Sequence, residues 1–218
     1  MTRPNNIIKR SLFFLSLIIL SIFIQFEVIF DINGTILHEN EDQFILLKTV
    51  LWLVVFVFFL WVYFKQLKKD KRTVFSLIGK LTHRNVLIFV GMFLLILIVN
   101  YIDIKLNPLV ISENQSIINQ YERIVPHLTI LSNSIFAPTI EEILFRGIFF
   151  NLFFQNKTKV NVILCIFFSG VIFSFAHQFT FDFNLLIYCA MGWILASTYW
   201  YTGSLSYPIA LHALVNIL

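Results

Sequence analysis

A succession of apolar runs of near-bilayer length occupies most of the chain and limits what it can fold into. A helix needs about 20 residues, within a range of roughly 17–25, to cross the hydrocarbon core of a membrane. The first six runs reach that range and the last is shorter. The pattern predicts an all-α, polytopic membrane helix bundle with about seven transmembrane helices. The runs are Ser11–Phe30, Phe44–Phe64, Val86–Ile102, Leu128–Phe154, Val160–Ala176, Phe183–Tyr201 and Leu205–Leu218.

The composition excludes a soluble protein. Hydrophobic residues make up 58% and charged residues 13% of the 218 residues, whereas soluble domains average roughly 45–50% and about 25%. The chain holds 26 phenylalanines, more apolar surface than a soluble fold of this size can bury. The net charge of +4 is typical of a membrane protein with basic cytoplasmic loops. We therefore expect the lipid bilayer, and no nucleic acid, as a partner.

Loop charges predict the orientation in the membrane. The segment Lys65–Arg84 is strongly basic and the segment Asp31–Asp42 is acidic. The positive-inside rule then places the N-terminus and the basic segment in the cytoplasm. The first apolar run is long for a signal peptide and no Ala-x-Ala-like site follows it, so we expect a retained helix. Abundant Ile, Phe, Asn and Lys indicate an AT-rich genome, and we expect a bacterial plasma membrane protein.

A polar stretch before the fourth run carries a helix signal. Ser112 to Gln115 fits a capping box, a pattern that starts helices. Apolar residues from Ile117 to Val125 then fall on one helical face, and Pro126 ends the pattern. We expect a short amphipathic helix in the membrane interface, with an ordinary structured loop as the alternative.

Three charges interrupt the fourth run, in the stretch APTIEEILFRG from Ala137 to Gly147. An ionisable residue inside a spanning helix costs about 2.5–3.5 kcal/mol on insertion scales and normally needs a partner or a wet cavity. Glu142 and Arg146 are four residues apart and share one helix face, whereas Glu141 points away from them. Pro138 removes a backbone hydrogen bond, which frees a carbonyl and makes room for water. We therefore expect an ion pair and, beside it, an unpaired carboxylate that water can reach.

Three more polar residues accompany later apolar runs. His177 ends the fifth run, and His212 and Asn216 lie one helical turn apart on the last. A carboxylate with an imidazole can deprotonate water, and a second imidazole with an amide can donate hydrogen bonds to an oxyanion. Glu141 and these three residues therefore make a plausible hydrolytic site. The structural alternatives are a buried clamp for the ion pair and interhelical hydrogen bonding for His212 and Asn216.

The same residues stand in a pattern that resembles the CPBP family of intramembrane proteases. This family comprises CAAX-processing and bacteriocin-processing enzymes and is also termed Abi. Its pattern is Glu-Glu-x-x-x-Arg, then Phe-x-x-x-His, then His-x-x-x-Asn. The matching residues, in order and on successive apolar segments, are Glu141, Glu142 and Arg146, then Phe173 and His177, then His212 and Asn216. The likeness covers roughly the second half of the chain.

The resemblance implies an intramembrane glutamic endopeptidase that hydrolyses a membrane-associated or leader-type peptide without a metal. By this pattern Glu141 and His177 would activate water, and His212 and Asn216 would form the oxyanion hole. Glu142 and Arg146 would support the site. We take residues 1–218 as a single membrane domain, in which residues 1–105 are scaffold helices and residues 106–218 are the catalytic core.

Three alternatives stay open from the sequence. Glu141, His177 and His212 would also make a three-ligand set for catalytic zinc, so the expectation of no cofactor competes with a zinc site. A bacteriocin self-immunity factor or a membrane scaffold would keep the fold without hydrolysis. A transporter with Glu141 as its proton site is disfavoured, because the sequence shows no paired repeats with matching broken helices.

Overall fold

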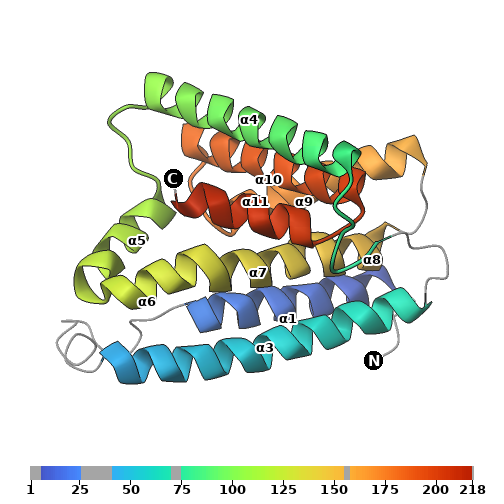
Figure 1. Ribbon diagram of the computed structural model, residues 1–218, viewed down its shortest axis with the longest axis horizontal. Helices are drawn as coiled ribbons and strands as arrows, with labels where there is room; N and C mark the ends of the chain where they lie inside the picture. Colours follow the sequence, from blue (N-terminus) through green and yellow to red (C-terminus); the bar gives the residue numbers. More distant parts are fainter. Residues whose placement is uncertain (1–5, 26–40, 70–74, 155–157, 218) are drawn as a thin grey trace.

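The computed structural model describes residues 6–25, 41–69, 75–154 and 158–217, and most of these are helical. The predicted all-α helix bundle is confirmed, and Figure 1 shows most of its helices running along the long axis of the molecule. Residues 31–40 and 70–74, which contribute to the predicted orientation, lie outside the described residues. The helices are α1 (Ile7–Gln25), α3 (Glu41–Lys69), α4 (His83–Leu106), α5 (Glu113–Ile124), α6 (Pro126–Leu131), α7 (Ala137–Glu142), α8 (Phe149–Phe153), α9 (Lys159–Phe175), α10 (Phe183–Thr202) and α11 (Ser206–Ile217), with π-helical turns η1 (Ser132–Phe136) and η2 (Ile143–Ile148).

The segment Pro126–Phe153 is the central helix of the bundle. It consists of α6, η1, α7, η2 and α8 in succession. Of its apolar window 56% is buried, against 6–17% in the corresponding windows of α1, α3 and α4. It packs against α1 and α3 on one side and against α9 and α11 on the other (Figure 1). The three charges of the fourth run therefore lie on the most enclosed helix.

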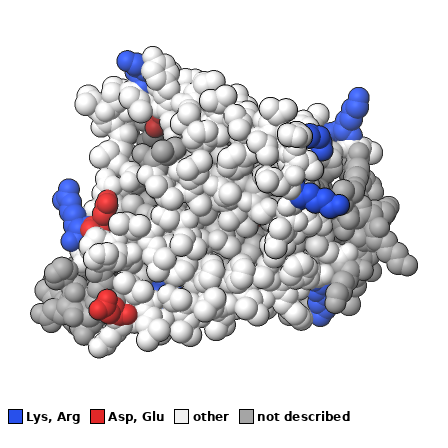
Figure 2. All heavy atoms as spheres, viewed as in Figure 1, with Lys and Arg blue, Asp and Glu red and all other residues white. Residues whose placement is uncertain are grey.

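The outer surface is suited to lipid. Four of the described helices are long and apolar enough to cross a membrane, namely Ile7–Gln25, Asp42–Leu67, His83–Leu106 and Pro126–Phe153, and α9 is a shorter apolar helix. Figure 2 shows charged side chains mainly at the two ends of the long axis, with a band of uncharged atoms between them. The chain is an integral membrane protein, and the number of about seven crossings stays a prediction.

Short polar residues set the start of several helices. Thr82 before α4, Thr158 before α9 and Asp182 before α10 each accept a hydrogen bond from the backbone N–H three residues later. Such caps satisfy a donor that a helix start leaves unpaired. Ser112 does the same for α5 by accepting from the Gln115 N–H, so the predicted helix start is confirmed. The position of α5 in the membrane interface stays a prediction.

The turn between α10 and α11 is held by the segment before α4. Gly203 ends α10 with a φ of 70°, a left-handed conformation that glycine adopts without strain. The Leu205 N–H donates to the Ser76 carbonyl at 3.0 Å. The Tyr207 hydroxyl donates to the Lys80 carbonyl at 2.8 Å. These bonds fix where α11 begins and therefore where its polar residues lie relative to the central helix.

Two glycines allow α9 and α10 to pack closely. A methyl group added at Gly192 of α10 would lie 2.7 Å from the Cα atom of Gly170 in α9. Small residues permit this approach between membrane helices, where packing replaces the hydrophobic effect as the main attraction. The indole N–H of Trp193 donates to the Phe167 carbonyl at 3.1 Å and adds a second tie between the helices.

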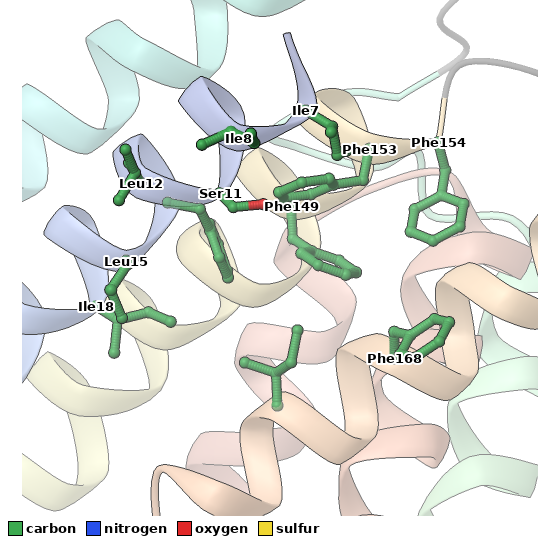
Figure 3. Close-up of a pocket in the computed structure, with 12 residues that line it drawn as sticks. Ile7, Ile8, Ser11, Leu12, Leu15, Ile18, Phe149, Phe153, Phe154 and Phe168 are labelled. Atoms are coloured by element: carbon green, nitrogen blue, oxygen red, sulfur yellow. The ribbon is translucent and has the colours of Figure 1, made fainter.

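An apolar groove of about 590 Å³ lies between α1, α8 and α9. Figure 3 shows Leu12 and Ile18 of α1 along one wall, with Phe153 and Phe168 on the other elements. Ser11 is the single polar residue among those that line it. None of the predicted site residues lines this groove, so the site lies elsewhere in the bundle.

Candidate active site

The predicted ion pair is present in the central helix. Arg146 Nη1 donates to Glu142 Oε1 at 2.7 Å, and both side chains are fully buried. Arg146 Nη2 also donates to the Gly192 carbonyl of α10 at 3.0 Å, and the ring of Phe173 lies 4.6 Å from the guanidinium carbon. A buried charge needs such additional contacts to offset its desolvation. The guanidinium therefore neutralises Glu142 and joins the central helix to α10.

His212 of α11 lies between this ion pair and Glu141. Its Nδ1 atom is 2.9 Å from Glu142 Oε1, and a carboxylate oxygen paired with a guanidinium can only accept. Nδ1 therefore carries the hydrogen, and this bond sets the orientation of the ring. The Nε2 atom lies 3.9 Å from Glu141 Oε2. Arg146, Glu142 and His212 thus form a chain that holds one imidazole facing Glu141.

His177 approaches Glu141 from the end of α9. Its Nδ1 atom is 2.8 Å from the Phe173 carbonyl oxygen, which can only accept, so Nδ1 carries the hydrogen here as well. Its Nε2 atom lies 3.4 Å from Glu141 Oε2. Two imidazoles from separate helices therefore present their Nε2 atoms to the same carboxylate oxygen.

The charges of the cluster require one additional proton for neutrality. Glu142 balances Arg146, which leaves the charge of Glu141 uncompensated. The side chains of Glu141, His177 and His212 are 6%, 12% and 8% exposed, and an unpaired charge in such an environment costs several kcal/mol. A proton shared between Glu141 and the two Nε2 atoms removes that charge. Among the described residues Glu141 Oε2 has no hydrogen bond, so it can accept one from a water molecule.

Pro138 frees a backbone carbonyl, as the sequence predicts. The Ala137 N–H donates to the Ser132 carbonyl within η1, and the next donor in that register would be Pro138, which has no N–H. The Asn133 carbonyl therefore loses its helical donor. The side-chain amide of Asn216 donates to this carbonyl at 2.9 Å. Asn216 thus ties α11 to the central helix.

The structure brings three of the four predicted catalytic residues into contact and places the fourth at the edge. Glu141, His177 and His212 converge, whereas Asn216 is exposed and its amide bonds Asn133. An amide nitrogen carries two hydrogens, so one remains for another acceptor. The role of Asn216 in an oxyanion hole stays a prediction.

The part of the chain that carries these residues matches a known family. Residues 123–218 match the model for type II CAAX prenyl endopeptidase Rce1-like proteins. This region of the chain is therefore similar to the Rce1-like family. The resemblance drawn from the three motifs is thereby confirmed, and every predicted site residue lies within the Rce1-like region.

A curated relative points the same way. A protein of Bacillus subtilis (strain 168) named "Putative membrane peptidase YdiL" is 37% identical over 106 residues. The match covers 48% of this chain and 41% of that protein, so the chain spans less than half the length of the relative it matches. No solved structure matches the chain.

The geometry of the same cluster bears on the zinc alternative. Within the ranges that the structure describes, no group of three His, Cys, Asp or Glu side chains is arranged to hold a metal ion. Glu141 Oε2 is 3.4 Å from one Nε2 atom and 3.9 Å from the other, separations that suit proton exchange directly or through water. Metal independence stays a prediction with a test of its own.

Sequence reasoning missed three residues that shape the site. Asn133 was missed because in an α-helix a proline frees the carbonyl four residues earlier, whereas in the π turn η1 it frees the one five residues earlier. Gly192, which bonds Arg146, and Tyr188, whose ring stacks on His177, lie in an apolar run without a local pattern that marks them. Their contacts arise from the packing of α10 against α9 and the central helix.

Proposed function

We propose that the chain is an intramembrane glutamic endopeptidase that hydrolyses a peptide bond without a metal. The observation that supports this most strongly is the convergence of two Nε2 atoms, from His177 and His212, on Oε2 of Glu141. A buried carboxylate between two imidazoles can take up a proton from water and deliver it to a nearby leaving group. The Rce1-like match and the peptidase name of the relative agree with this reaction class.

The reaction begins with a water molecule held by Glu141 and His177. Glu141 takes a proton from the water while the water oxygen bonds to the peptide carbonyl carbon, and the electron pair of the C=O bond moves onto the carbonyl oxygen. The proton then passes to the peptide nitrogen, the electron pair on the oxyanion re-forms the C=O bond as the C–N bond breaks, and a carboxylic acid and an amine leave. His177, with its Nδ1–H fixed by the Phe173 carbonyl, keeps Nε2 directed at the water and at Glu141.

His212 stabilises the oxyanion in this mechanism. Its Nδ1–H is engaged by Glu142, so Nε2 can donate only when the ring carries both protons. The additional proton that neutralises the cluster supplies this state. The ion pair of Glu142 and Arg146 therefore acts through His212, and Asn216 adds a second donor with its remaining amide hydrogen. A single oxyanion-hole donor contributes about 10²–10³-fold to kcat in proteases.

The substrate is, on this proposal, a membrane-associated or leader-type peptide, because the site lies within a helix bundle whose outer surface is apolar. We place the chain in a bacterial plasma membrane with its N-terminus in the cytoplasm. Lys65, Lys80 and Arg84 support this orientation, since they belong to the basic segment on either side of residues 70–74 and the positive-inside rule retains such segments in the cytoplasm. Residues 1–105 act as scaffold for the catalytic region.

The proposal is tested by comparing newly formed peptide N-termini in membranes of cells that carry the wild-type protein or Glu141→Gln. Glutamine keeps the size of the side chain but cannot take a proton from water. We expect a set of N-termini that is present with wild type and missing with the variant. Glu122→Gln, an exposed change on α5, is the matched control and should leave the set intact.

The non-catalytic alternative predicts a different outcome. If the chain is an immunity factor or a scaffold, Glu141→Gln leaves the N-termini unchanged while protection against a bacteriocin, or the signalling phenotype, persists. That result would remove hydrolysis from the proposed function.

A further inference from the structure

His177 lies just beyond Phe175, the last residue of α9, so helical backbone precedes it but does not follow it. Its imidazole contacts two aromatic rings, those of Phe173 and Tyr188, with centroid separations of 4.3 Å and 5.1 Å. The planes of His177 and Tyr188 differ by 23°, which makes this a stacked contact. Phe173 lies in the last turn of α9, four residues before His177, whereas Tyr188 comes from α10. Tyr188 is therefore the aromatic contact that reaches the His177 ring from another helix.

Tyr188 is itself anchored at the first turn of α5. Its hydroxyl is 3.0 Å from the Ser112 hydroxyl oxygen. Ser112 also caps α5 by accepting from the Gln115 N–H at 3.1 Å. The ring that stacks on His177 is thus linked through one hydrogen bond to the start of the amphipathic helix.

The chain directly after His177 reaches the same turn of α5. The Glu113 N–H donates to Gln178 Oε1 at 3.0 Å, and the Phe179 N–H donates to Glu113 Oε2 at 3.1 Å. Gln178 is 2% exposed, so the first of these bonds is partly buried, whereas the second is exposed. The loop that carries His177 and the ring that stacks on it are therefore held by neighbouring residues of one helix start.

We propose that Tyr188 is a positioning residue for His177 and that it connects His177 to α5. This inference rests on the proposed function for its effect on catalysis. Rotation of the imidazole about its Cβ–Cγ bond would break the Nδ1–H bond to the Phe173 carbonyl and turn Nε2 away from Glu141. The stacked ring of Tyr188 blocks that rotation, and its hydroxyl bonds Ser112 at the start of α5. The ring is the part that acts on His177, so phenylalanine substitutes for tyrosine and leucine does not.

The test follows the His177 imidazole by nitrogen NMR in the full-length protein with ¹⁵N-labelled histidine, assigned with His177→Gln. We expect a single Nδ1–H species in the wild type and in Tyr188→Phe, and averaged nitrogen signals in Tyr188→Leu. Tyr201→Leu, an exposed change on the same helix, is the control and should match the wild type. Unchanged His177 signals in Tyr188→Leu overturn the inference, as does an equal loss in Tyr188→Phe.

Peptide cleavage supplies the second readout. In Tyr188→Leu we expect kcat to fall by about 10- to 100-fold, the effect of a displaced catalytic group, with KM unchanged and the activity restored in Tyr188→Phe. Should Tyr188→Leu fail to fold, Tyr188→Met decides, because methionine keeps apolar volume but has no ring to stack on His177 and should still broaden the His177 signals; unchanged signals there overturn the inference. A wild-type protein that shows the expected NMR signals but cleaves no peptide contradicts the proposed function and leaves the positioning of His177 intact.

Discussion

Pro138→Ala should remove the loss of stability that Asn216→Ala causes, because both changes act on the hydrogen bonding of the Asn133 carbonyl. In the wild type this carbonyl lacks its helical donor and accepts the Asn216 amide at 2.9 Å. Pro138→Ala restores a backbone N–H that can bond Asn133 or release the Ala137 N–H for it. With that donor present, the carbonyl no longer depends on Asn216.

The size of the effect follows from one hydrogen bond. A net intramolecular hydrogen bond contributes about 0.5–1.5 kcal/mol, and an enclosed carbonyl left unpaired costs about 1–3 kcal/mol. Asn133 is partly buried and Asn216 is exposed, so water offsets part of the loss. We therefore expect Asn216→Ala to lower the free energy of unfolding by about 1 kcal/mol in the wild type. In the Pro138→Ala protein the same change should cost close to nothing.

The assay is a double-mutant cycle on the free energy of unfolding in detergent micelles, with cleavage measured on the same four proteins. Ile217→Ala, an exposed change next to Asn216, is the control and should be additive with Pro138→Ala. Additive losses for Asn216→Ala and Pro138→Ala would refute the carbonyl argument. If cleavage stays lost in the double variant while stability recovers, Asn216 also acts on the substrate, as the oxyanion role requires.

Three further changes test the support of the site. Arg146→Met leaves the buried Glu142 carboxylate without its cation and should lower the free energy of unfolding by about 3–5 kcal/mol. The exposed Arg123→Met should be neutral, and equal unfolding curves for Arg146→Met and wild type contradict the buried ion pair. Gly192→Ala places a methyl group 2.7 Å from the Cα atom of Gly170. It should lower the free energy of unfolding by about 1–3 kcal/mol, because it pushes α9 and α10 apart. Gly91→Ala is the control: its added methyl group meets nothing within 4 Å, so it should not destabilise the protein in this way. Treatment with a chelator should leave peptide cleavage unchanged, with elemental analysis showing that the treated protein contains no zinc. A loss of activity that zinc alone restores would establish the zinc alternative.

Local patterns predicted the helices because each apolar run must satisfy its own backbone hydrogen bonds in lipid. The apolar run Val86–Ile102 lies inside α4, which begins at His83 and ends at Leu106. The helix is longer than the run because its first and last residues include polar ones, which apolar patterning does not count. The amphipathic pattern after Ser112 likewise predicted α5. In both cases the sequence pattern and the helix that it predicts depend on residues close together in the chain.

The site could be predicted only where its contacts lie within one helix. The ion pair follows from the spacing of Glu142 and Arg146, and the freed carbonyl follows from Pro138. The contact of His212 with Glu142 depends on how α11 is placed, and long-range bonds such as that between Leu205 and Ser76 fix that placement. The π turns on either side of α7 also change which side chains share a face, and apolar periodicity does not register them.

The most direct test of the account is the kcat/KM of purified protein on a cleaved peptide, with wild type and Glu141→Gln compared under the same conditions. The peptide is taken from the N-termini that disappear in cells carrying the variant, and equal unfolding curves confirm that both proteins are folded. Loss of the group that deprotonates water predicts a decrease of about 10²–10⁴-fold. A Glu141→Gln protein that cleaves the peptide at the wild-type rate would contradict the claim that Glu141 activates the attacking water.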